Sequence, residues 1–123
     1  MTDRARVSRL RQEIGRLAAE WDRLREQMLR AGPMIAGSLI ARRLGTRERK
    51  RASTAHYLSW AEGGKTVLRH VARDDVGRVG AKAEAWRAYR RRLRRCRQVA
   101  LRLLELLDQL GREQAERPGK EGP

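Results

Sequence analysis

Arginine is the residue type whose number and spacing in this sequence point most directly to chemistry. Residues 87–97 span about three helical turns and contain seven arginines: Arg87, Arg90, Arg91, Arg92, Arg94, Arg95 and Arg97. The nearest acidic residues along the chain are Glu84 and Glu105. Guanidinium groups at this density repel one another, and contacts with phosphate relieve the repulsion and release condensed counterions. The stretch therefore predicts salt-sensitive, sequence-tolerant binding of DNA or RNA. The alternative is the solvated face of a coiled coil, in which acidic residues are usually interspersed.

A second basic stretch, residues 42–51, contains six basic residues and one acidic residue. We interpret it as an exposed loop that contacts phosphate, although a solvated loop without a particular function fits the same composition. The residues predicted to bind nucleic acid in the two stretches are Arg42, Arg43, Arg47, Arg49, Lys50, Arg51, Arg87, Arg90, Arg91, Arg94, Arg95 and Arg97.

The sequence contains no set of residues typical of an enzyme or a metal site. His56 and His70 lie near the ends of two predicted strands, and no carboxylate or thiol is placed to complete a triad or a metal site with them. Cys96 is the single cysteine, so no intramolecular disulfide forms. Because it occupies an apolar position of a helical pattern, we predict a buried thiol. We expect a protein that is not an enzyme and uses no catalytic residue, metal or cofactor.

The composition of the whole chain also favours a polyanionic partner. The 123 residues carry a net charge of +15, and the sequence pI is near 11.6. An arginine-rich chain from a GC-rich genome is the alternative explanation, but that bias alone would not leave Asp and Glu at half the number of Lys and Arg. The sequence has no secretory signal and no apolar run of transmembrane length. We therefore expect a cytoplasmic protein without a membrane partner.

Residues 55–71 have the pattern of a β-hairpin. Residues 56–60 are rich in aromatic side chains, and residues 66–71 are rich in β-branched side chains that alternate with others. Between the two runs, Gly63 and Gly64 supply the positive φ angles of a tight turn. An isolated hairpin is marginally stable in water, so this one needs a third strand or a helix against its apolar face. Residues 38–43 are the candidate third strand.

Two heptad patterns flank this hairpin and predict helices at about residues 4–31 and 74–111. Asp3 is placed to cap the first helix, Pro33 ends it, and Arg16 and Glu20 are spaced for an ion pair. The apolar seam of the first helix is Val7, Leu10, Ile14, Leu17, Trp21, Leu24 and Met28. The seam of the second is Trp86, Tyr89, Leu93, Cys96, Ala100, Leu103, Leu107 and Leu110. We expect the helices to pair antiparallel, so that each seam covers the other.

Together these elements predict an α+β protein with two long heptad-patterned helices flanking a small antiparallel sheet. The helices are too long for a compact globule of this size, so we expect residues 1–110 to form a single elongated domain and residues 112–123 a disordered tail. Extra leucines in residues 101–107 widen the apolar stripe beyond a two-helix seam. They predict a homodimer or a partner helix at the stripe from Leu103 to Leu110. The alternative function is accordingly a coiled-coil protein-interaction or assembly module.

Several short motifs follow one another between residues 34 and 95. They are Gly-Ser-Leu-Ile at 37–40, Tyr-Leu-Ser-Trp at 57–60, Gly-Gly-Lys-Thr at 63–66, Arg-His-Val at 69–71, and Trp86, Tyr89 and Arg90 in the next helix. In this order they resemble a family of small prokaryotic proteins classed only as a domain of unknown function. The resemblance implies a helix, strand, hairpin and helix layout and brings no biochemical activity with it. In that family the loop before the hairpin usually carries clustered cysteines that look like a metal knuckle. Residues 45–52 contain no cysteine here, so the resemblance implies that any such metal site is lost.

Overall fold

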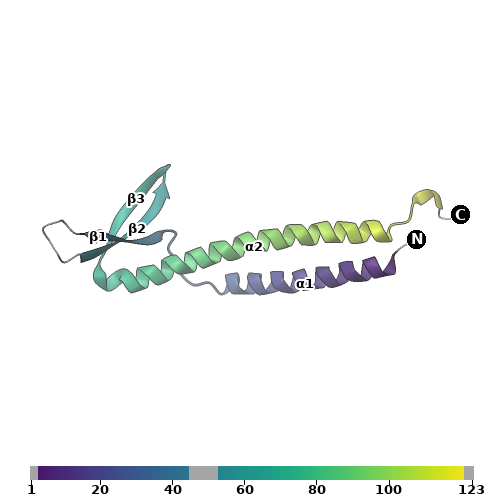
Figure 1. Ribbon diagram of the computed structural model, residues 1–123, viewed down its shortest axis with the longest axis horizontal. Helices are drawn as coiled ribbons and strands as arrows, with labels where there is room; N and C mark the ends of the chain where they lie inside the picture. Colours follow the sequence, from purple (N-terminus) through teal and green to yellow (C-terminus); the bar gives the residue numbers. More distant parts are fainter. Residues whose placement is uncertain (1–2, 45–52, 121–123) are drawn as a thin grey trace. The chain divides into compact units, whose positions relative to one another are not determined.

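The computed structural model of the 123-residue chain describes residues 3–44 and 53–120. In chain order it contains a helix, three strands and a second, longer helix (Figure 1). The elements are α1 (Arg4–Leu29), β1 (Ser38–Leu44), β2 (Ser53–Glu62), β3 (Lys65–Val71), α2 (Val76–Gln114), and short 3₁₀ helices at Arg73–Asp75 and Pro118–Lys120. The predicted α+β class, with two helices flanking a small antiparallel sheet along the chain, is confirmed.

The chain divides into two compact units. Unit 1 consists of Met1–Arg30 and Arg92–Pro123, and unit 2 consists of Ala31–Arg91. Helix α2 is continuous, so its first residues belong to unit 2 and the remainder to unit 1. Each unit has its own buried side chains.

The sheet of unit 2 is antiparallel, with the strand order β1-β2-β3. The tight turn predicted inside the hairpin is confirmed, because Gly63 and Gly64 have φ angles of 57° and 78°, and a type I′ turn requires positive φ at both central residues. The candidate third strand is also confirmed, since β1 pairs with β2 and places Leu39 opposite Leu58. The hairpin is therefore part of a three-stranded sheet.

One face of this sheet carries most of its apolar side chains. By strand register these are Leu39, Leu58, Trp60, Val67 and Val71. The start of α2 lies against this face, because a Cβ atom added to Gly80 would be 3.1 Å from the Cδ2 atom of Leu39. Val79 and Ala83 of α2 are buried. The helix therefore supplies the apolar cover that a small sheet needs in water.

Helix α1, in unit 1, begins and buries its side chains as the sequence predicts. The carboxylate of Asp3 accepts hydrogen bonds from the backbone N–H groups of Ala5 (3.0 Å) and Arg6 (3.2 Å), which confirms the N-cap. The buried residues of α1 are Val7, Leu10 and Leu17. All three belong to the predicted seam, so the heptad spacing identified the correct face of this helix.

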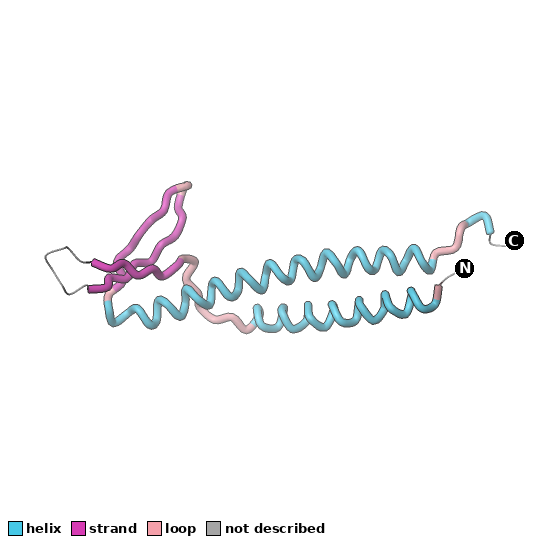
Figure 2. The backbone as a smooth tube through the Cα atoms, viewed as in Figure 1, coloured by secondary structure: helices cyan, strands magenta, loops and turns pink. Residues whose placement is uncertain are grey.

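In unit 1, α1 runs antiparallel to the C-terminal part of α2 (Figure 2). Arg6, at the start of α1, pairs at 3.0 Å with Glu113, near the end of α2. Farther along α1, Glu20 pairs with Arg95, which comes early in this part of α2. A cluster of four buried side chains lies between the two helices: Leu10, Leu17, Val99 and Leu106.

The seam predicted for α2 is wrong in part, because it contains Ala100 and Leu107 and omits Val99 and Leu106, the two most buried residues of the helix. The heptad spacing places Leu107 in the seam, but this residue is 49% exposed, whereas Leu106 is 2% exposed and Val99 is 1% exposed. Cys96 is buried as predicted. Because leucine occupies five of the seven positions 101–107, more than one series with steps of three and four fits this stretch. Contact with α1 selects the series that contains Val99 and Leu106.

Replacement of Leu106 by alanine should therefore destabilise unit 1 much more than the same replacement of Leu107. The Leu106→Ala change leaves a cavity in the buried cluster, and such changes typically cost about 2–5 kcal/mol. Leu107→Ala removes a half-exposed side chain and should cost about 1 kcal/mol or less. The check is urea unfolding followed by circular dichroism at 222 nm. Equal losses for the two variants would contradict the assigned seam.

In unit 2, Gly37 should tolerate alanine far less well than Gly77. A Cβ atom on Gly37 would lie 2.9 Å from the backbone oxygen of Ser59 and 3.1 Å from the Cδ1 atom of Leu58, so β1 and β2 would have to move apart. A Cβ atom on Gly77 would meet no heavy atom within 4 Å apart from its own helix backbone. Gly77 lies in helix α2, where alanine is favoured over glycine by about 0.8–1.0 kcal/mol. Thermal unfolding should show a lower Tm for Gly37→Ala and an equal or higher Tm for Gly77→Ala.

Candidate nucleic-acid interface

The candidate interface is the arginine-rich stretch of α2. Residues 85–104 contain eight arginines and no acidic residue: Arg87, Arg90, Arg91, Arg92, Arg94, Arg95, Arg97 and Arg102. The structure places all of them in α2, with the first three in unit 2 and the others in unit 1. The acidic residues near them in space determine which of these positive charges are compensated.

At the start of the stretch, one carboxylate is shared by two arginines. Glu84 lies 3.9 Å from a guanidinium nitrogen of Arg87 and 3.3 Å from one of Arg91. All three side chains are more than half exposed, and ion pairs in such positions contribute at most about 1 kcal/mol. Glu84 therefore compensates one of two positive charges without holding either arginine firmly.

Arg90 contacts an aromatic ring. Its guanidinium carbon lies 5.5 Å from the ring centroid of Trp86, one helical turn earlier. This is within the range of a cation–π interaction. The indole ring attracts the cation and carries no formal negative charge, so the full positive charge of Arg90 remains.

Arg95 has an acidic partner on the other helix of unit 1. Its Nε donates to one oxygen of Glu20 at 2.6 Å, and its Nη2 donates to the other oxygen at 3.0 Å. These hydrogen bonds hold the pKa of Glu20 below its ordinary value and raise the pKa of Arg95. Arg95 therefore joins α2 to α1 and presents less uncompensated charge than its neighbours.

The ion pair predicted between Arg16 and Glu20 is not the one that forms. Arg16 instead bonds Glu13, with Nη2 2.6 Å from Oε1, and Glu20 is left to bond Arg95. The hydrogen bond to Arg16 lowers the pKa of Glu13. Glu13 and Glu20 each lie one helical turn from Arg16 in α1. Because Arg95 of α2 bonds Glu20, Arg16 bonds Glu13.

Arg94 and Arg97 are exposed and lie one turn apart on the same side of α2. None of the ion pairs among the described residues involves either of them. Arg90, in unit 2, likewise takes part in none of these ion pairs. These three arginines are the strongest candidates for phosphate contacts.

The second predicted basic stretch is described only in part. Arg42 and Arg43 lie at exposed positions of β1, and successive residues of a strand point to opposite faces. Arg42 stacks over Tyr57 with 5.6 Å between its guanidinium carbon and the ring centroid, while Arg43 lies opposite Thr54. The other four residues of this prediction, Arg47, Arg49, Lys50 and Arg51, lie outside the described residues.

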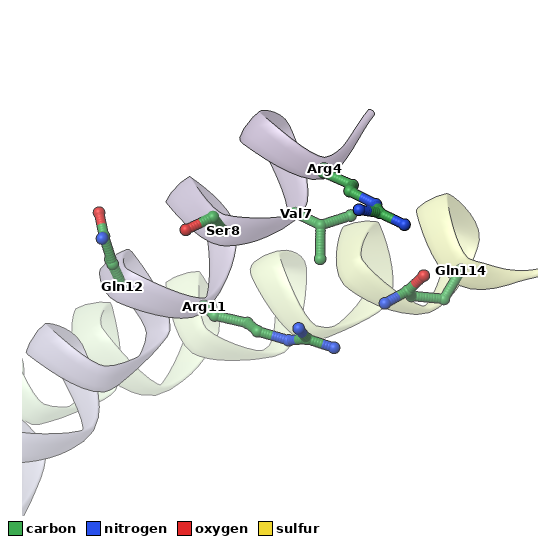
Figure 3. Close-up of a pocket in the computed structure, with 6 residues that line it drawn as sticks. All are labelled: Arg4, Val7, Ser8, Arg11, Gln12 and Gln114. Carbon is green, nitrogen blue, oxygen red and sulfur yellow. The ribbon is translucent and has the colours of Figure 1, made fainter. Parts of the chain in front are cut away.

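A basic hollow at one end of unit 1 was not identified in the sequence. It is lined by Arg4, Val7, Ser8, Arg11, Gln12 and Gln114. In Figure 3 the guanidinium groups of Arg4 and Arg11 extend from α1 towards the end of α2 that carries Gln114. The spacing of these two arginines, seven residues apart on a predicted helix, was the available signal. All of its polar lining side chains are exposed, so nothing about the hollow indicates a built binding site.

The histidines do not form a metal site. The strand register places His56 opposite Val71 and His70 opposite Tyr57, so the two imidazoles belong to opposite faces of the sheet. The ring of His70 instead contacts that of Tyr57 edge to face at 5.5 Å. In the part of the chain that the structure describes, no three His, Cys, Asp or Glu residues are grouped in a way that could hold a metal ion.

Comparisons with family models, with curated proteins and with solved structures found no match to this chain. Neither helix within residues 3–44 and 53–120 combines the length and the apolar character needed to cross a membrane.

Loss of the bond between Glu20 and Arg95 should have a pH-dependent effect on stability. Because the pKa of Glu20 is lower in the folded protein than its ordinary value of 4.5, its ionised form stabilises the fold above that value. This contribution is lost as the pH falls through the folded-state pKa, below 4.5. The Glu20→Gln variant should therefore have a lower Tm than the unmodified protein at pH 7, and the difference should shrink when the pH is lowered below 4.5.

The control for this measurement is Glu116→Gln, which changes a carboxylate beyond the end of α2. It should leave Tm nearly unchanged at both pH values. A difference for Glu20→Gln that is the same at neutral and acidic pH would show that the ion pair does not stabilise unit 1.

Proposed function

We propose that this protein is a non-enzymatic nucleic-acid-binding protein that contacts the phosphate backbone through the arginine-rich stretch of α2. The observation that carries the proposal is the absence of acidic residues from residues 85–104, which contain eight arginines. Among the described residues, Glu84, Glu20 and Glu105 are the acidic groups paired with arginines of this stretch. Arg90, Arg94 and Arg97 keep their full charge.

The physical basis of the proposed binding is the neutralisation of phosphate charge. Each arginine that contacts phosphate on double-stranded DNA releases condensed counterions and contributes about −0.9 to the slope of log affinity against log salt concentration. Contacts from Arg90, Arg94 and Arg97 would give a slope of about −2.7, which is a loss of affinity of about 40-fold between 50 and 200 mM salt. Such contacts carry no direct sequence information, so we expect binding to tolerate different sequences.

Arg42 and Arg43 are secondary contacts in this proposal. Arg42 presents a guanidinium group beside Tyr57, a combination that also suits stacking against an unpaired base. Binding that depends on Arg42 would favour single-stranded over double-stranded nucleic acid. DNA and RNA both carry backbone phosphates, so phosphate contacts do not distinguish between them.

The second candidate function is a protein-assembly module. The observation that favours it is the exposure of Leu101 (63%) and Leu104 (64%) on α2, because exposed leucines grouped on one helix face are typical of interaction surfaces. The two functions differ in their response to charge. Neutralisation of Arg90 and Arg94 would weaken phosphate binding and would not affect an assembly surface made of leucines.

The experiment compares the Arg90→Gln/Arg94→Gln variant with the unmodified protein after removal of co-purified nucleic acid. Fluorescence anisotropy with labelled duplex DNA, single-stranded DNA and RNA would be recorded from about 50 to 200 mM salt. We expect the variant to bind more weakly at low salt and its salt slope to be shallower by about 1.8. The polymer with the highest affinity identifies the preferred class of nucleic acid.

The matched control is Arg30→Gln/Arg117→Gln, which removes the same charge from two exposed positions outside the stretch. This variant should keep the salt slope of the unmodified protein. An equal loss of affinity in both variants would mean that net charge alone determines binding. Absence of binding by the unmodified protein at about 50 mM salt would reject the proposed function.

A further inference from the structure

We propose that a second copy of this chain docks antiparallel against one face of α2 in unit 1. The face consists of Arg97, Leu101, Leu104 and Asp108, and we call it the dimer face. Successive members are four, three and four residues apart, so they form one stripe along the helix. Arg97 also belongs to the arginine-rich stretch, but the proposed dimer does not depend on nucleic-acid binding, because its other three residues lie outside the proposed phosphate contacts.

The dimer face is distinct from the face of α2 that packs against α1. Val99 and Leu106 are buried against α1, and Leu103 and Leu110 pack beside them. Leu101 and Leu104 remain 63% and 64% exposed. Helix α2 thus carries two apolar stripes in unit 1, and α1 covers one of them.

Charge identifies a second copy as the occupant. The whole chain has a net charge of +15 and should repel itself over most of its surface. Residues 97–114 are an exception, because they contain three basic and three acidic residues. Two copies would therefore meet with the least repulsion along this part of α2.

The order of residues in the dimer face is self-complementary. It begins with a cation, continues with two leucines and ends with an anion. When two such stripes run antiparallel about a two-fold axis, residues at equal distances on either side of the axis face each other. The midpoint between residues 97 and 108 is also the midpoint between residues 101 and 104. With the axis at this midpoint, Leu101 faces the partner's Leu104 and Arg97 faces the partner's Asp108. An isologous interface of this kind uses each contact twice. The four leucines would lie between two ion pairs.

Asp108 also has a partner within its own helix. One of its carboxylate oxygens lies 2.9 Å from Nε of Arg112, and both side chains are more than half exposed. A carboxylate has two oxygens that accept hydrogen bonds, so Asp108 can bond Arg112 and the partner's Arg97 together. The exposed pair within the helix is worth about 0–1 kcal/mol and does not prevent the contact between copies.

The small size of the dimer face sets the expected strength of the dimer. The stripe covers about 17 Å of helix and contains two leucines, so each copy would bury less than the roughly 800 Å² per partner of a standard stable interface. We expect a reversible dimer that is populated at protein concentrations on the order of 10–100 µM.

Charge exchange tests both the face and the orientation. Sedimentation velocity of nucleic-acid-free protein, from about 5 to 500 µM, would measure the monomer–dimer equilibrium around the expected range. Arg97→Asp alone and Asp108→Arg alone should each weaken the dimer by about tenfold, because each places like charges opposite one another. The double variant restores opposite charges in the antiparallel pairing and should return to within about threefold of the unmodified protein.

Net charge alone gives a different result. Arg97→Asp lowers the positive charge of the chain, so a dimer limited by general repulsion would become stronger and not weaker. Leu104→Glu should abolish the dimer while helical circular dichroism is retained, since the side chain is exposed. Leu29→Glu, at a leucine that is 78% exposed at the end of α1, is the control and should leave the dimer unchanged. A protein that is monomeric at every concentration, a dimer that survives Leu104→Glu, or single variants that the double variant does not rescue would each overturn the proposal.

Discussion

The apolar contact between α1 and the C-terminal part of α2 is the interaction on which the rest of unit 1 depends. Leu10 and Leu17 of α1 and Val99 and Leu106 of α2 are buried in one cluster. Their burial fixes the rotation of α2 about its own axis. Arg95 consequently lies where it bonds Glu20, whereas Arg94, one position earlier, is exposed and unpaired among the described residues. Hydrophobic packing thus decides which arginines are compensated.

The surface charge of α2 contributes little to holding this fold together. Most of the ion pairs of the described residues connect residues within a single turn or two of one helix and have side chains that are more than half exposed, and such pairs are worth about 0–1 kcal/mol. Seven arginines within residues 87–97 repel one another. Contact with a polyanion, as proposed for this stretch, would relieve that repulsion.

Local chemistry determined the features that the sequence predicted correctly. Gly63 and Gly64 specify the hairpin turn because few other residues accept positive φ at both central positions. Asp3 specifies the start of α1 because its carboxylate can reach two backbone N–H groups. The short apolar run after Gly37 identified the third strand. Features that depend on contacts between elements could not be predicted from such local patterns. In the leucine-rich residues 101–107, the spacing fits a series through Leu107 as well as one through Leu106, and only the position of α1 selects Leu106.

The choice of Glu13 over Glu20 as the partner of Arg16 likewise depends on Arg95, which is 75 residues from Glu20 in the sequence. For the candidate site, the sequence located the arginine-rich stretch, and the helix packing then separated its paired from its unpaired members.

The most direct test of phosphate binding by α2 is to follow the side-chain Nε–Hε NMR signals of the arginines during titration with a short DNA duplex at about 50 mM salt. If α2 contacts phosphate as proposed, the signals of Arg94 and Arg97 should shift at the lowest DNA concentrations, whereas the signal of Arg16, held by Glu13, should change little. Equal shifts of arginine signals over the whole chain, or shifts that leave Arg94 and Arg97 unaffected, would contradict phosphate binding by this stretch of α2.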